Sequence, residues 1–98
     1  MTQQIFFMPA ARAEFIDALD WYEREAKGLG TRLQGEVDAQ VRRIAANPLQ
    51  FPIVLHDVRR ARLRRFPYSL FFRVLGDAVY VIACFHSSRD PHIWQNRP

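Results

Sequence analysis

Apolar residues recur every three or four positions through the first half of the chain. A short apolar run, Ile5 to Met8, predicts a strand, and Pro9 then has the position that proline favours at the start of a helix. From residue 9 to 27 an apolar stripe alternates with a charged side, which predicts an amphipathic helix. The stripe comprises Ala11, Phe15, Ala18, Leu19, Tyr22 and Ala26.

A second apolar stripe follows the first after a short break. Gly28-Leu29-Gly30 interrupts the first helix, and Thr31 is a residue type that caps helix N-termini. Leu33, Val37, Val41, Ile44 and Ala45 make the second stripe. They predict a helix over residues 30–46 that ends at Asn47-Pro48, so that the two helices form a hairpin. The positions expected in the core are Phe15, Leu19, Tyr22, Leu33, Val37, Val41 and Ile44.

The period of the pattern changes from about four to two after Pro52, as it does between helix and sheet. From residue 60 to 64 arginines alternate with apolar residues. Two runs rich in β-branched and aromatic residues, 68–75 and 79–86, flank Gly76-Asp77, a pair that suits a tight hairpin turn. The sequence therefore predicts an antiparallel meander of three strands.

The predicted fold class is α+β: an N-terminal strand, then a helical hairpin packed on a small antiparallel sheet of three further strands. The helices cover one face of the sheet and leave the other free for function. The 98 residues, 49% hydrophobic and 13% aromatic, suit a single folded domain over residues 1–98. The one cysteine, Cys84, cannot form an internal disulfide, and neither a secretory leader nor a membrane-spanning run is recognisable. We expect a cytoplasmic protein without contact to a membrane.

Positive charge is concentrated in the second half of the chain. Residues 1–49 carry six basic and seven acidic side chains, whereas residues 50–98 carry eight arginines, three aspartates and no lysine. Arginine has a planar fork that binds carboxylates and phosphates through paired hydrogen bonds and stacks on aromatic rings. The second half therefore indicates an anionic partner, with a solvated, solubilising face as the alternative.

No motif for a metal, a cofactor or a nucleophile stands out. The three histidines and the cysteine lack the spacing that brings two metal ligands to one site. Two serines follow His86 without the strand-to-helix elbow of a hydrolase. The glycines of residues 28–30 follow a helix rather than a strand, so they do not form a phosphate-binding loop. We expect neither a metal nor a cofactor.

One constellation combines arginine, histidine and aromatic side chains. It comprises Arg62, Arg64, Arg73, His86, Arg89, Tyr68, Tyr80 and Trp94. Arginine binds phosphate or carboxylate, aromatic rings stack on bases and histidine exchanges protons near neutral pH, so the set suits RNA or a strongly acidic protein segment. The structural alternative is that the tyrosines pack on the sheet, His86 ends a strand and Trp94 covers the sheet edge.

Three short motifs and the order of the elements carry a family resemblance. The motifs are Arg64-Arg65-Phe66-Pro67-Tyr68, FFRV at 71–74, and the segment from His86 to Pro91 (HSSRDP), with Trp94 and Arg97 behind it. Together with the order of strand, helical hairpin and three strands, they resemble the RelE/ParE superfamily of toxins from type II toxin-antitoxin systems. The likeness covers nearly the whole chain and is greatest to the ParE-like branch, often labelled plasmid stabilisation protein.

The resemblance implies a small toxin kept silent by a cognate antitoxin, whose C-terminal segment wraps around it in a toxin-antitoxin hetero-oligomer. ParE-like members inhibit DNA gyrase without known enzymatic activity, whereas RelE-like members cleave messenger RNA in the ribosome. This chain has no lysine after Lys27 and has Trp94 where the nuclease branch often has an ionisable group, which favours gyrase as the target. The alternatives are a ribosome-dependent nuclease and a degenerate, non-toxic binding module.

The residues expected to bind the target or the antitoxin combine the constellation with the end of the chain. They are Arg62, Arg64, Tyr68, Arg73, His86, Arg89, Trp94 and Arg97. If the chain is a nuclease, His86 and His92 are the candidates for proton transfer, and the arginines are candidates for a phosphate clamp. No catalytic residue is assigned.

Overall fold

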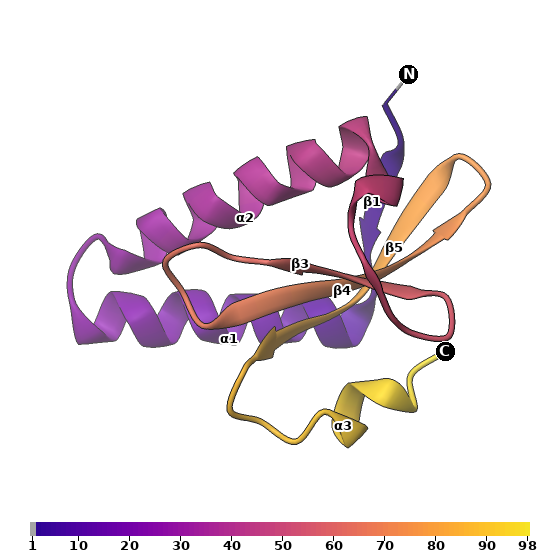
Figure 1. Ribbon diagram of the computed structural model, residues 1–98. Coiled ribbons are helices and arrows are strands. Elements are labelled where there is room, and N and C mark those ends of the chain that lie inside the picture. The colour runs from indigo at the N-terminus through magenta and orange to yellow at the C-terminus, as the bar shows by residue number, and fades with distance from the viewer. Residues whose placement is uncertain (1) are drawn as a thin grey trace.

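The chain forms a sheet with a long helical hairpin on one side and a short C-terminal helix on the other (Figure 1). The computed structural model describes residues 2–98. The elements are β1 (Gln4–Phe7), α1 (Pro9–Glu25), α2 (Leu29–Ala46), the 3-10 turn η1 (Pro48–Gln50), β2 (Ile53–Leu55), β3 (Val58–Arg62), β4 (Tyr68–Leu75), β5 (Ala78–His86) and α3 (His92–Gln95). Within the described residues the sheet has five strands in the order β1-β5-β4-β3-β2. β1 runs parallel to β5, and the other neighbouring strands are antiparallel.

The predicted α+β class, the N-terminal strand and the helical hairpin are confirmed, but the sheet has one strand more than expected. β2 has only three residues, two of them exposed, and it pairs with β3 across a turn in which His56 has a positive φ of 50°. Its residues, Ile53, Val54 and Leu55, are all apolar. An edge strand this short, without alternation, has no period-two signal to recognise.

The helical hairpin packs its apolar stripes on one face of the sheet, as predicted. Leu33, Val37 and Ile44 of α2 are buried, and so are Ala11 and Ala18 of α1. The small side chains of the two alanines let α1 lie close to the sheet. The other residues of the stripes that were expected in the core are half-buried and pack against it; they are Phe15, Leu19, Tyr22 and Val41. The stripe of α2 therefore lies deeper than that of α1.

The turn between the helices is capped by Glu23 and not by Thr31, so the predicted cap is wrong. α2 begins at Leu29, and Gly28 precedes it with φ 93°, a left-handed conformation that glycine adopts without strain. The Glu23 carboxylate accepts hydrogen bonds from the backbone N–H groups of Gly28 and Gly30, each at 3.0 Å. It thus satisfies N–H groups that the start of a helix leaves without a partner.

The opposite face of the sheet is only partly free, contrary to expectation. Trp94 of α3 stacks on Phe71 of β4, with ring centroids 4.1 Å apart and planes at 21°. Trp94 therefore covers the face of the sheet and not its edge. A bulge in β5 widens the apolar cluster under α3, because the neighbours Ile82 and Ala83 both belong to it. The whole cluster comprises Val58, Phe71, Ile82, Ala83, Phe85 and Trp94.

Candidate functional site

A groove on the open face of the sheet lies between β3, β4 and the segment that follows β5. Its volume is ≈ 320 Å³. Arg60 and Arg62 both line it, because alternate residues of a strand project to the same face. The other lining residues are Ser69, Phe71, Phe85, His86, Ser87, Arg89, Pro91 and Trp94. This basic groove brings together Arg62, His86, Arg89 and Trp94, four of the residues expected to bind a partner.

An arginine, a serine hydroxyl and an aromatic ring lie side by side in the basic groove, and a second arginine lies over the ring. The register places Arg62 opposite Ser69, and Ser69 opposite Phe85, so these side chains lie in one row across three strands. The Cζ atom of Arg89 lies 4.5 Å from the ring centroid of Phe85. One terminal nitrogen of this guanidinium lies 3.4 Å from the Glu14 carboxylate, and its other N–H groups remain available to an anion in the groove.

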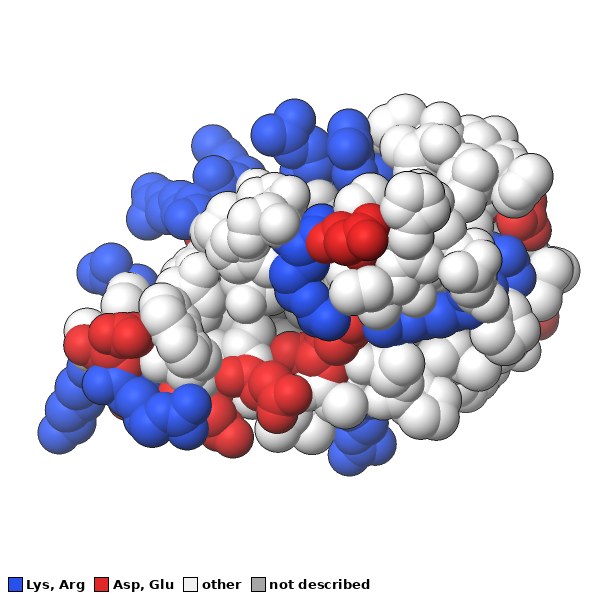
Figure 2. Space-filling view, turned by 90° about the horizontal axis from the view of Figure 1, so that it is seen from below, with Lys and Arg blue, Asp and Glu red and all other residues white. Residues whose placement is uncertain are grey.

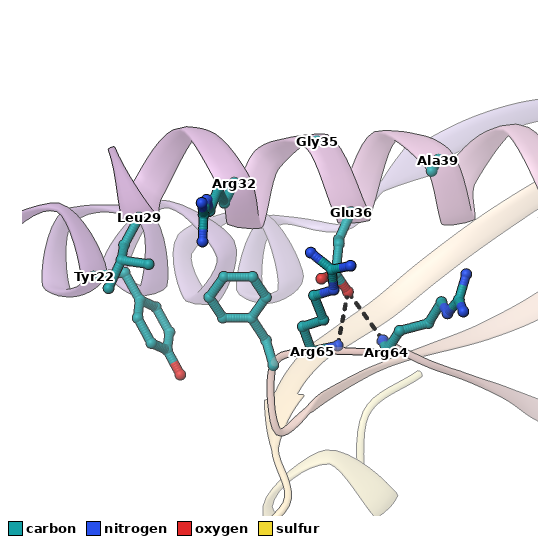
Figure 3. A pocket seen from close by; sticks show the side chains of 9 residues that line it. Tyr22, Leu29, Arg32, Gly35, Glu36, Ala39, Arg64 and Arg65 are labelled. Atoms are coloured by element: carbon teal, nitrogen blue, oxygen red, sulfur yellow. Dashed lines mark hydrogen bonds between the residues drawn. The ribbon is translucent and has the colours of Figure 1, made fainter. Parts of the chain in front are cut away.

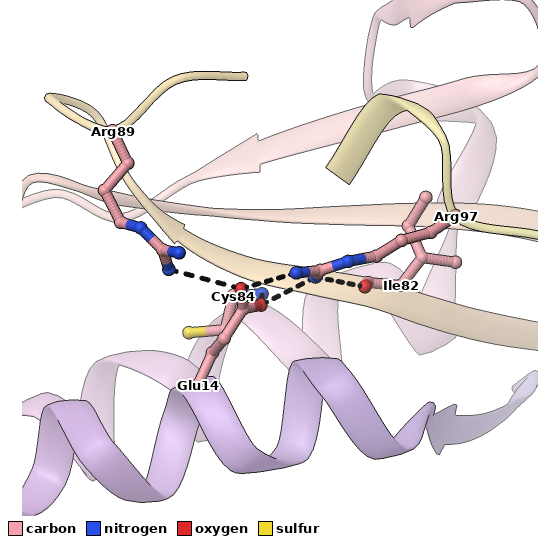
Figure 4. Close-up of polar contacts among 5 residues, drawn as sticks. All are labelled: Glu14, Ile82, Cys84, Arg89 and Arg97. Atoms are coloured by element: carbon pink, nitrogen blue, oxygen red, sulfur yellow. Dashed lines mark hydrogen bonds and ion pairs between the residues drawn. The ribbon is translucent and has the colours of Figure 1, made fainter. Parts of the chain in front are cut away.

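Glu14 of α1 is the centre of the polar contacts between this helix and the end of the chain (Figure 4). Its carboxylate accepts two hydrogen bonds from Arg97, each 2.9 Å, and one from the backbone N–H of Cys84 at 3.1 Å. Arg89 approaches the same carboxylate at 3.4 Å. Arg97 also donates to the carbonyl of Ile82 at 3.0 Å. These five residues, the Glu14 cluster, connect α1, β5 and the C-terminal segment.

The Glu14–Arg97 pair at the centre of the cluster is largely shielded from water, whereas the Arg89 side chain is 46% exposed. The side chains of Glu14 and Arg97 are 13% and 19% exposed, so their ion pair is screened less than one at the surface. Burial, and the Glu14 carboxylate nearby, raise the pKa of the Cys84 thiol to about 12. Cys84 is therefore a neutral thiol at neutral pH and a poor nucleophile. Arg97, although expected to bind a partner, has both terminal nitrogens engaged within the fold.

Arg73 lies outside the basic groove. Its Nε is 3.2 Å from Oδ1 of Asp57, and its cross-strand neighbour is Tyr80 of β5. The ring of Tyr80 stacks on Phe6 of β1, with centroids 5.4 Å apart. The constellation expected from the sequence is therefore divided between two regions of the sheet.

Tyr68 and His86 are cross-strand neighbours at the end of the sheet, with ring centroids 5.0 Å apart. Tyr68 points toward the helices, where it packs against Tyr22 at a centroid distance of 6.1 Å. Burial raises the pKa of Tyr68, so its phenol is neutral at neutral pH. The Nδ1 of His86 accepts the backbone N–H of Ser88 at 3.0 Å, which leaves the proton of a neutral ring on Nε2.

The loop between β3 and β4 carries unpaired positive charge beside the basic groove. Arg62, Arg64 and Arg65 line a depression that shares Ser69 and Ser87 with that groove. The three side chains make no ion pair or hydrogen bond with any other residue from 2 to 98. Figure 2 shows basic side chains gathered along one margin of the molecule, apart from the main group of acidic ones. Arg64 thus lies next to the basic groove and not in it.

Sequence reasoning missed Glu14 and left Arg60 out of the candidate site. For both residues, the spacing from their neighbours in the sequence indicates the face on which they lie. Glu14 lies three positions after Ala11 and four before Ala18, which are both buried, so it belongs to the buried side of α1. Arg60 lies two positions before Arg62 and shares its face of the strand.

The basic groove suits binding more than proton transfer. No carboxylate lines it among the described residues, and the nearby Glu14 is already held by two arginines. No group of three potential metal ligands occurs within residues 2–98. In the same part of the chain, the helices fall short of the length and apolar character needed to cross a membrane.

Two comparisons with known proteins, one of sequence and one of structure, both relate this chain to ParDE toxin-antitoxin systems. The family model described as ParE toxin of type II toxin-antitoxin system, parDE, matches residues 5–91. A chain of the chromosomal ParDE TA system from P. aeruginosa is similar with a TM-score of 0.75 and 20% sequence identity, over 87% of this chain and 96% of that chain. No curated protein matches the sequence. At this identity the structural likeness shows the fold alone, whereas the family match covers most of the sequence.

Proposed function

We propose that this chain, which belongs to the ParE toxin family of type II toxin-antitoxin systems, inhibits DNA gyrase and is neutralised by a cognate antitoxin. The observation that carries the proposal is the composition of the basic groove. Arg60, Arg62 and Arg89 surround aromatic rings, and none of the lining residues in the described chain is acidic. Such a groove recognises an anionic macromolecular surface by charge and geometry.

The end of the chain supports an inhibitor over a nuclease. Trp94 is buried in the position where a nuclease of this superfamily often has an ionisable group, and Arg97 is paired with Glu14. Neither residue can pass a proton to a substrate in the basic groove. His86 remains, but its Nδ1 is occupied by the backbone N–H of Ser88. The groove therefore supplies contacts for binding without an evident acid-base pair.

The first test is the supercoiling of relaxed plasmid DNA by gyrase, which the purified protein should inhibit. The double variant Arg62→Ala, Arg89→Ala removes two cations of the basic groove and should raise the half-inhibitory concentration at least ~10-fold. The matched double variant Arg24→Ala, Arg42→Ala removes two exposed arginines of the helical hairpin and should leave inhibition unchanged. Circular dichroism checks that both fold. Normal supercoiling at excess wild-type protein contradicts the proposal.

The second test is the response of cells. Expression without the antitoxin should cause double-strand breaks, filamentation and a DNA-damage response, while messenger RNA stays whole. Co-expression of the antitoxin should restore growth, because in this proposal the bound antitoxin keeps the toxin from its target. Growth that is unaffected by expression of the toxin alone indicates the degenerate, non-toxic module.

One observation favours a second function, ribosome-dependent cleavage of messenger RNA. His86 and Arg89 lie together at one end of the basic groove, where the His86 ring packs on Tyr68, so that a phosphate bound at this end would meet a cation close to an imidazole. In that case expression cleaves messenger RNA while supercoiling stays normal. The double variant His86→Ala, Arg89→Ala should then lower cleavage at least ~100-fold.

A further inference from the structure

A second groove lies on the helix side of the molecule, between α2 and the loop that joins β3 to β4 (Figure 3). Its volume is ≈ 660 Å³, compared with ≈ 320 Å³ for the basic groove. Tyr22, Leu29 and Phe66 provide apolar walls. Gly35 and Ala39, one turn apart on α2, leave the surface of the helix open along the groove. We refer to it as the α2 groove.

Three arginines surround the α2 groove without a partner in the fold. Arg32 comes from α2, and Arg64 and Arg65 come from the facing loop (Figure 3). All three residues are exposed. Their guanidinium groups make no ion pair or hydrogen bond with any other part of the chain between residues 2 and 98. The groove therefore carries positive charge that no acidic residue of the described chain neutralises through direct contact.

The single carboxylate in the α2 groove has a structural role. Oε1 of Glu36 accepts the backbone N–H of Arg64 at 2.9 Å and that of Arg65 at 3.1 Å (Figure 3). These bonds hold the loop against α2 and so fix where the side chains of Arg64 and Arg65 begin. Glu36 thus positions two of the three cations instead of neutralising them.

We infer that the α2 groove seats an extended acidic segment of a partner protein, with apolar side chains against the groove walls and carboxylates on the three arginines. The inference rests on the proposed function, in which the antitoxin supplies this segment. Arginine pairs well with carboxylates, and apolar walls between the cations suit a peptide in which the two kinds of residue alternate. A nucleic acid fits less well, because its continuous row of phosphates would meet Glu36 inside the groove.

The test is a fluorescence anisotropy titration of the purified full chain with a defined probe. The probe is a fluorescein-labelled peptide of three Leu-Glu-Ser-Glu repeats, and its counterpart has lysine in place of glutamate. The acidic peptide should bind and the basic one should not. The triple variant R32E/R64E/R65E should weaken binding of the acidic peptide about 30-fold, since each exposed pair contributes modestly and the pairs add.

A triple variant with the same change in net charge is the control. R12E/R24E/R42E reverses three exposed arginines of the helical hairpin that do not line the α2 groove, and it should weaken binding less than about 3-fold. Equal losses in the two triple variants, or no binding of the acidic peptide to the wild type, overturn the inference. So does an oligothymidylate that displaces the peptide from the wild type and loses affinity for the R32E/R64E/R65E variant.

Growth assays separate this inference from the proposed function. The R32E/R64E/R65E variant should still arrest growth when it is expressed without the antitoxin, because its basic groove is intact. An arrest that disappears in this variant, while circular dichroism shows it folded, assigns the α2 groove to the target and overturns the inference. If the wild type itself causes no arrest, the proposed function fails, and the peptide titration still decides the α2 groove.

Discussion

Arginine has opposite roles in the Glu14 cluster and in the α2 groove. In the Glu14 cluster, Arg97 pairs with a carboxylate that is 13% exposed and holds the end of the chain against α1 and β5. In the α2 groove, three exposed arginines surround Glu36 of α2, which accepts only the backbone N–H groups of Arg64 and Arg65 in the facing loop. Shielded arginine thus contributes to the stability of this fold, whereas exposed arginine remains available to a partner. The number of arginines in a segment does not distinguish these roles.

The largest effect should come from the apolar contact that supports the Glu14 cluster. Trp94→Ala removes the stacking on Phe71 and should lower the free energy of unfolding by about 3 kcal/mol, the usual cost of truncating a buried aromatic side chain. Urea unfolding followed by circular dichroism measures this. Trp94→Phe keeps a ring and removes an Nε1–H that has no partner within residues 2–98, so it should cost less than about 1 kcal/mol. An Ile93→Ala variant that loses as much as Trp94→Ala contradicts the assigned role of the stack.

Removal of the central carboxylate tests the cluster itself. Glu14→Gln keeps the size of the side chain but leaves the shielded Arg97 guanidinium without its counter-charge, which should cost about 2 kcal/mol in urea unfolding. Asp17→Asn, an exposed change on the same helix, should cost less than about 0.5 kcal/mol. Similar losses in both variants mean that Glu14 contributes only to the overall charge of α1.

The thiol of Cys84 should make the free energy of unfolding depend on pH in the alkaline range. Its pKa is raised from 9.0 to about 12, so the folded state keeps the proton that the unfolded chain loses above pH 9. This contribution to stability is complete below pH 9 and declines as the pH rises toward 12, by about 1.4 kcal/mol between pH 8 and pH 10. The free energy of unfolding should therefore fall less over that interval in Cys84→Ala than in the wild type. Equal slopes indicate that the thiol is not shielded as described.

The helical hairpin and the three-strand meander are predictable from the sequence, because long amphipathic stripes and paired β-rich runs have strong periodic signals. Leu33, Val37 and Ile44, which the second stripe predicts to be in the core, are all buried. β2 and α3 are not predictable in the same way. They have three and four residues, and their position depends on contacts with distant segments, such as that of Trp94 with Phe71.

The candidate site is only partly predictable, because its arginines are alike in sequence and differ only in their partners. Arg62, His86, Arg89 and Trp94 meet in the basic groove, since adjoining strands and the segment after β5 bring them together. Arg97 belongs to the Glu14 cluster, through a carboxylate 83 residues away in the chain. No local pattern contains that pairing. Partners at such separation become visible only in the folded chain.

The smallest effect on stability should come from substitutions of the arginines in the α2 groove. One arginine from each region, Arg65 and Arg97, allows a direct comparison. Arg65→Ala removes an exposed guanidinium with no partner in the described chain, so the free energy of unfolding should change by less than about 0.5 kcal/mol. Arg97→Ala removes the partner of a shielded carboxylate and should cost about 2 kcal/mol in the same urea titration. Affinity for the acidic peptide should show the reverse order, falling about 3-fold for Arg65→Ala and remaining unchanged for Arg97→Ala in its folded state. If the two variants lose equal stability, or if Arg97→Ala is the one that loses peptide binding, the division between structural and recognition arginines is wrong.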